Sequence, residues 1–196
     1  MPLWGAVEGS ESLPKFLTTA QQKDVFANQS GWVVEAGSAM TGNGNTSADP
    51  EILVAIGGLA GASGTTGLGE ATINTVDWNI TTFDKSAGGT LSVTVRYNET
   101  VTVAVSNPTI IVTNNNRANH TLTYASGTGT HELTFTLVIA AANAATNAGD
   151  VLSVAAQSIV LASSSTIKDT SDTPANAELA ISSAQGTACG TITVVA

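Results

Sequence analysis

The residues of this chain best able to hold a metal ion are two histidines, and their spacing argues against a shared site. A zinc site needs about four Cys, His, Asp or Glu ligands close together. His120 and His131 flank the clearest hairpin of the chain. If Leu122 lies opposite Leu133 or Phe135, the two rings are roughly 13–20 Å apart at ~3.3 Å per residue. We interpret both as strand-end histidines and expect no metal and no cofactor.

Carboxylates are the other groups that could do chemistry, and calcium is the ion that suits them best. The chain has no Asp-x-Asp-x-Asp-Gly loop, so we interpret its loop acids as solvated. It also lacks the Gly-x-Ser-x-Gly and Gly-x-Gly-x-x-Gly patterns that position a nucleophile or a phosphate. We therefore predict that the protein is not an enzyme. The acids in or near predicted strand ends and loops are Asp77, Asp84, Glu99, Asp150, Asp169 and Asp172.

The composition of the chain limits the kinds of partner that we expect it to bind. Six Lys and Arg residues against fifteen Asp and Glu give a net charge of −9 over 196 residues. Nucleic-acid binding depends on clustered basic residues, so we expect none. The apolar runs are shorter than the ~20 residues of a membrane helix. The N-terminus resembles no secretory signal, which predicts synthesis in a cytoplasm without processing. A single cysteine, Cys189, excludes an internal disulfide.

The elements that must position these side chains are strands, because apolar residues fall on every second position between Leu91 and Ile139. A period of two predicts strands with one buried and one exposed face. Short strands joined by polar turns predict an antiparallel β-sandwich. The expected strands are 71–80, 90–97, 101–105, 109–112, 120–125, 131–139, 151–161, 179–182 and 191–195, with a hairpin turn at 126–129.

The chain divides by composition into three regions. Residues 1–50 predict an extended N-terminal arm with one short helix over Thr19–Ala27. Residues 51–70 predict one strand and a Gly-rich linker, and residues 71–196 predict the β-sandwich. The arm has aromatic residues but no periodic face on which to bury them. We therefore expect them to bind a partner or a neighbouring subunit; they are Trp4, Phe16, Phe26 and Trp32.

The third region resembles a family of bacterial Ig-like modules. The resemblance rests on Val93–Glu99, on Tyr124–Gly129 leading to Leu133–Phe135, and on the loop before Val151 followed by Thr166–Asp169. It implies an Ig-like sandwich, and it implies fold far more than function. The sequence departs from the family at Thr100, where the family often has proline.

The first region resembles the N-termini of virion structural proteins of tailed phages, especially marine and cyanobacterial ones. The segments that carry this resemblance are Trp4-Gly5, Pro14–Leu17, Asp24–Ala27, Gly31–Val33 and Glu51–Gly57. It implies a virion protein whose partners are the major capsid protein or other virion proteins, and we expect a homo-oligomer. The function we expect is capsid decoration or cementing of the phage head, with no enzymatic activity. The alternative is a cell-surface or tail-fibre module for adhesion or carbohydrate binding.

Overall fold

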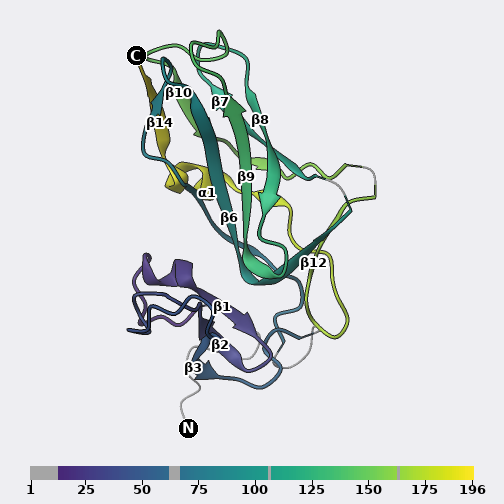
Figure 1. The fold of residues 1–196 in the computed structure, drawn as a ribbon. Helices are drawn as coiled ribbons and strands as arrows, with labels where there is room; N and C mark the ends of the chain where they lie inside the picture. Colours follow the sequence, from purple (N-terminus) through teal and green to yellow (C-terminus); the bar gives the residue numbers. More distant parts are fainter. Residues whose placement is uncertain (1–12, 62–66, 106, 163) are drawn as a thin grey trace.

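The structure is a computed structural model that describes residues 13–61, 67–105, 107–162 and 164–196. Strands make up 45% and helices 6% of it, so the expected all-β class is confirmed. Trp4 lies outside the described residues. Within the described ranges, no helix has the length and hydropathy needed to span a bilayer. The chain forms a small sheet at one end of a larger β-structure (Figure 1).

The elements follow one another with mostly short connections. In the N-terminal unit (residues 13–61 and 67–69) they are η1 (Gln21–Asp24, a 3₁₀ helix), β1 (Val25–Asn28), β2 (Gly31–Val34) and β3 (Glu51–Ala55). In the body (residues 71–196) they are β4 (Ile73–Trp78), β5 (Phe83–Asp84), β6 (Gly89–Ala104), β7 (Thr109–Asn114), β8 (His120–Ser126), β9 (Thr130–Ile139), β10 (Val151–Val154), β11 (Gln157–Ser158), β12 (Thr166–Asp169), β13 (Ala180–Ile181), α1 (Ser183–Cys189) and β14 (Thr191–Val195).

Strand β6 is the element to which most of the others attach. Its first half pairs with β4 on one side and β9 on the other. Its second half pairs with β12, and Ala27 of β1 pairs in parallel with Glu99 at its middle. The described strands thus join along one path, β3-β2-β1-β6-β9-β8-β7-β10-β14-β5, with β4 and β12 attached to β6 as branches. Among the described strands, β11 and β13 form a separate pair. Since the pairing gives one continuous path, the Ig-like sandwich stays a prediction.

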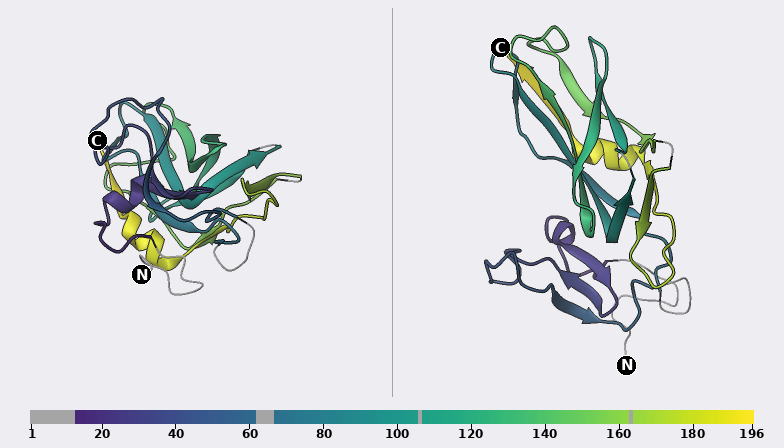
Figure 2. Two further views of the ribbon diagram at one scale, coloured as in Figure 1. Left: turned by 90° about the horizontal axis from the view of Figure 1, so that it is seen from below. Right: turned by 45° about the vertical axis from the view of Figure 1, so that its right-hand side comes forward.

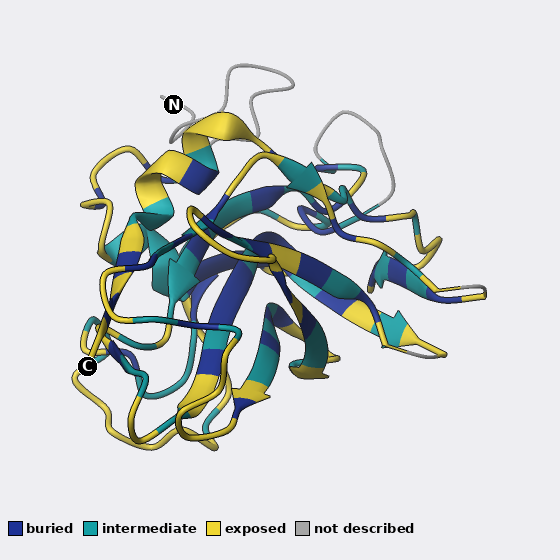
Figure 3. Ribbon diagram, turned by 90° about the horizontal axis from the view of Figure 1, so that it is seen from above, coloured by how far each residue is buried: buried dark blue, intermediate teal, exposed yellow. Residues whose placement is uncertain are grey.

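The alternation in the sequence explains the core of the body. Leu91, Val93, Val95 and Tyr97 of β6 are fully buried, while Ser92 and Arg96 between them are half-buried. Buried and exposed positions alternate along the strands in the same way elsewhere (Figure 3). β-Branched and aliphatic residues from β7 to β10 and β14 complete this core. Burial of these side chains is the main term that stabilises the body.

The N-terminal region is a folded sheet, which corrects the prediction of an extended arm. β1, β2 and β3 pair antiparallel, and their side chains enclose a second core that includes Val25, Trp32 and Val34. Leu59 and Leu68, from the segment predicted as strand and linker, complete that core. The alternation argument missed β1 and β2 because nearly every residue in them is buried.

Several boundaries also differ from the predictions. The helix expected over Thr19–Ala27 is only the 3₁₀ helix η1, because Val25 and Phe26 enter strand β1. The two strands predicted at 90–97 and 101–105 are one strand, β6, and the one predicted at 151–161 breaks into β10 and β11. Helix α1 and strands β5 and β12 were not predicted. Ser182 and Gln185 form a capping box at α1, a signal that was visible in the sequence.

The hairpin predicted at 126–129 is confirmed between β8 and β9, although the register differs. Phe135 lies opposite Tyr124, so Leu122 does not face Leu133 or Phe135. At the turn, Gly127 has φ 113° and Gly129 has φ 83°, values that L side chains rarely adopt. A Cβ on Gly127 would lie 1.8 Å from the carbonyl oxygen of Glu132, whereas one on Gly129 meets nothing within 4 Å.

Gly127→Ala is therefore expected to destabilise the protein by more than 2 kcal/mol, and Gly129→Ala by about 1 kcal/mol, since only the first adds a steric clash to the unfavourable φ. Urea unfolding followed by circular dichroism measures both. Equal losses for the two variants would show that the described hairpin geometry is wrong.

Candidate functional site

The structure separates the aromatic residues that the sequence predicts as partner contacts. Phe16 is exposed, with 60% of its surface accessible. Trp32 is buried in the N-terminal core, and Phe26 is buried between the two parts of the molecule. Phe16 therefore stays a partner-contact prediction, whereas Phe26 and Trp32 have intramolecular neighbours. The burial of Trp32 was not predicted, because the residues that cover it, such as Leu59, come from a segment predicted to be strand and linker.

Phe26 and His131 form the joint between the N-terminal unit and the body. Their rings stack with centroids 4.4 Å apart and planes 13° from parallel. The Nε2 atom of His131 lies 3.3 Å from the carbonyl oxygen of Lys23, which precedes β1. With Ala27 paired to Glu99, β1 is thus held to β9 by its side chain and to β6 by its backbone. The right-hand view of Figure 2 shows the N-terminal sheet below the larger β-structure.

A network of charged side chains crosses the seam, which is the boundary between the N-terminal unit and the body. Lys23 of the N-terminal unit pairs with Asp77 of β4. Asp77 also accepts from Nη1 of Arg96 at 2.7 Å, and Nε of Arg96 donates to Glu132 at 2.5 Å. These side chains are between one sixth and about one third exposed, so the network is screened less than a fully exposed one. It orients Glu132 beside His131.

Glu35, which the sequence analysis did not single out, faces this network from the end of β2. Its Oε2 atom is 3.7 Å from Nε2 of His131. The pKa of Glu35 is raised to about 7, mainly by burial and also by the nearby carboxylates of Glu132 and Asp24, against the lowering effect of Arg96. Burial also lowers the pKa of His131. No local motif marks Glu35, because its neighbours come from β9 and η1.

Glu99 is the second buried acid at the seam. It is 1% exposed, and neither carboxylate oxygen has a hydrogen-bond partner within the described residues. Burial, together with the nearby Asp169, raises the pKa of Glu99 to about 8. Asp169 is satisfied by Ser171 and by the backbone of Ala175. At neutral pH the Glu99 carboxyl is therefore mainly protonated.

The remaining acids named in the sequence analysis do not converge on one ion. Asp150 accepts hydrogen bonds from Asn114, Asn116 and the backbone of Asn147. Asp84 accepts from the backbone of the following turn. The two histidines start antiparallel strands, so they lie at opposite ends of the β8–β9 hairpin, His120 facing Val112 of β7. Asp84, Asp150 and the two histidines thus lie in separate surroundings.

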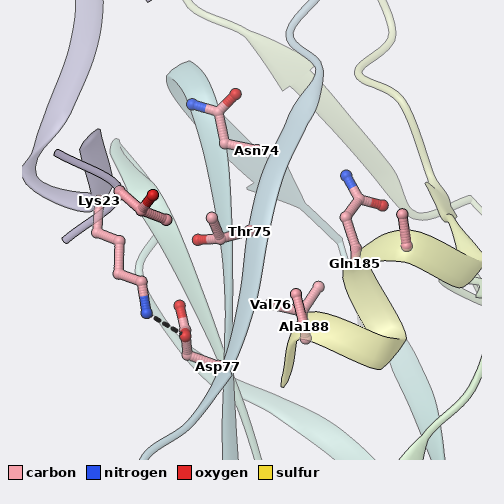
Figure 4. A pocket seen from close by; sticks show the side chains of 9 residues that line it. Lys23, Asn74, Thr75, Val76, Asp77, Gln185 and Ala188 are labelled. Carbon is pink, nitrogen blue, oxygen red and sulfur yellow. Dashed lines mark hydrogen bonds and ion pairs between the residues drawn. The ribbon is translucent and has the colours of Figure 1, made fainter. Parts of the chain in front are cut away.

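A cavity of about 290 Å³ opens where the N-terminal unit, β4 and α1 meet (Figure 4). Lys23 reaches across it to Asp77, and Asn74 and Gln185 line its sides. Among the residues that the structure describes, none hydrogen-bonds the Oγ1 atom of Thr75, which is buried there. The accessible lining is mostly apolar, and the Gln185 amide is already bonded to the backbones of Ser182 and Ile73.

The outer surface of the N-terminal unit has a different character. β3 ends the strand path, so one of its edges is unpaired among the described strands. Ile52 in β3 is 56% exposed, and Phe16 is exposed on the same unit. A free strand edge beside exposed apolar side chains is a typical site for contact with another chain.

Phe26→Ala is expected to weaken the joint by about 3 kcal/mol, because it removes a buried aromatic ring and its stack on His131. Hydrogen exchange should then accelerate in β1–β3 more than in β7 and β8. Phe16→Ala, an exposed position, serves as the control and should change neither. Uniform acceleration through the whole chain would contradict a separable joint.

Glu99→Gln is expected to change how stability depends on pH. Because the pKa of Glu99 is raised from 4.5 to about 8 on folding, its contribution is fully present below pH 4.5 and is lost as the pH rises through 8. The variant lacks this loss, so from pH 5 to 9 it should gain about 2 kcal/mol or more relative to wild type. Denaturant unfolding at both pH values measures it, and parallel pH profiles would contradict the assignment.

We compared the chain with protein-family models, with curated proteins and with solved structures, and none of the three comparisons found a match. The function must therefore be argued from the residues and geometry of this chain.

Proposed function

We propose that this protein is a non-enzymatic structural component of a phage virion, and most specifically a decoration or cement protein of the capsid. The observation that carries the proposal is the unpaired edge of β3, with Ile52 and Phe16 exposed on the same unit. In this proposal the N-terminal unit contacts the major capsid protein or a neighbouring copy. The body projects from the shell, and the protein joins the virion after synthesis in the host cytoplasm.

The proposed mechanism is the addition of many modest contacts across the shell. An edge strand can pair with a strand of another chain, and apolar side chains beside it lose water on contact. One such contact is weak, but repeated copies that touch one another and the shell gain avidity from their effective concentration. The net charge of −9 keeps the unattached protein soluble. The resemblance of the first region to phage virion proteins supports the same proposal.

Point variants test this more sharply than removal of residues 1–50. Such a deletion would leave β3 without its partner β2 and would uncover His131, so a loss of binding would have two causes. Phe16 and Ile52 are exposed, and their replacement leaves the folded chain intact.

Ile52→Lys and Phe16→Ala are each expected to reduce incorporation into capsids at least tenfold, because they place charge on the strand edge or remove an apolar anchor. Val138→Lys is the matched control, since Val138 is an exposed apolar residue in a strand of the body. Capsids lacking the chain are mixed with each purified variant, and bound copies are counted by mass spectrometry. Normal incorporation of both test variants would contradict the proposal, as would a wild-type chain that binds glycans and no capsid.

A further inference from the structure

Three side chains with metal-binding atoms converge at the joint between the N-terminal unit and the body. They are Glu35, His131 and Glu132, and their ligand atoms all lie within 4.8 Å of one another. Glu35 follows β2, whereas the other two are neighbours in β9. His131 lies opposite a register shift of β6 between Arg96 and Val101, where side chains are redirected relative to a regular ladder.

The ligand atoms of the cluster lie close together, but they do not hydrogen-bond one another. Nε2 of His131 is 3.7 Å from Oε2 of Glu35, which is too long for a hydrogen bond. Its contact with the carbonyl oxygen of Lys23, at 3.3 Å, is the one that a metal ion on Nε2 would replace. Arg96 holds Oε1 of Glu132 at 2.5 Å, and such an outer contact orients a metal-binding carboxylate. The stack of Phe26 on His131 orients the imidazole.

The charges around the cluster favour a divalent cation. Carboxylates of Asp24, Glu35, Asp77 and Glu132 lie in the network with the cations of Lys23 and Arg96. The four carboxylates outnumber the two cations, an excess of negative charge that a divalent cation would reduce. Desolvation makes such an excess costly in the absence of a counter-charge.

We propose that Glu35, His131 and Glu132 bind one divalent transition-metal ion, with zinc as the best fit, and that the ion ties the N-terminal unit to the body. One imidazole nitrogen and two carboxylates are typical ligands of zinc, with a fourth position left for water. Calcium would need six or more oxygen ligands, and a histidine does not suit it. The inference goes beyond the proposed function and holds whether or not the chain binds a capsid.

The geometry requires only small side-chain movements. Tetrahedral ligands about 2.05 Å from zinc are about 3.4 Å apart. The side chains of Glu35 and Glu132 are each about one third exposed, so they have room to rotate toward His131. Because two ligands come from β9 and one from the end of β2, an ion here would couple the two parts of the chain.

Titration of the full-length protein with zinc or cobalt tests the proposal. After treatment with a chelator, the wild type should bind one equivalent of Zn²⁺ by calorimetry at pH 7.5. With Co²⁺ it should develop the visible absorption of a low-symmetry nitrogen–oxygen site. His131→Gln and Glu35→Gln should each reduce the affinity at least tenfold, in the range expected for a lost metal contact.

The matched controls are His120→Gln and Glu51→Gln, which replace the other histidine and an exposed glutamate of β3. Both should bind Zn²⁺ with wild-type affinity. Glu35→Gln keeps the test decisive if His131→Gln fails to fold, because Glu35 is only half-buried. Absence of stoichiometric Zn²⁺ binding to the wild type, or unchanged affinity in Glu35→Gln, would overturn the proposal.

Discussion

The N-terminal sheet and the body have separate cores, and strands of both pair with β6. This is possible because β6 is long. Its first half carries the alternating apolar residues that close the core of the body between β4 and β9. Its middle, at Glu99, accepts β1 of the N-terminal unit in parallel, within the register shift with β9 between Arg96 and Val101. A shorter strand would leave the N-terminal sheet with side-chain contacts alone, such as Phe26 on His131.

The attachment of both parts to β6 buries acidic side chains at the seam, and this burial has an electrostatic cost. Glu99 is buried without hydrogen-bond partners, and Glu35 faces other carboxylates, so the pKa of each is raised. Buried acids of this kind destabilise the folded state once they ionise. The seam is therefore the part of the molecule most sensitive to protons and cations.

How far the sequence predicts this molecule depends on how local each signal is. The period of two between Leu91 and Ile139 predicts β6, β8 and β9 because each strand has one buried face. The same argument fails for β1 and β2, whose residues are nearly all buried and whose core depends on Leu59 and Leu68. The joint could not be predicted, since Glu35 meets His131 only through tertiary structure. Phe16 is exposed, and its role in contact with a partner stays a prediction.

The central claim is that the N-terminal unit, held on β6 and β9, is the part of the protein that meets its partner. A cryo-electron-microscopy reconstruction of capsids carrying the chain tests this most directly. We expect density for β1–β3 against the shell, with Phe16 and Ile52 at the contact. The strands β7, β10 and β14 should lie farther from the shell. Density in which β7, β10 and β14 rest on the shell and β1–β3 point into solvent would contradict it.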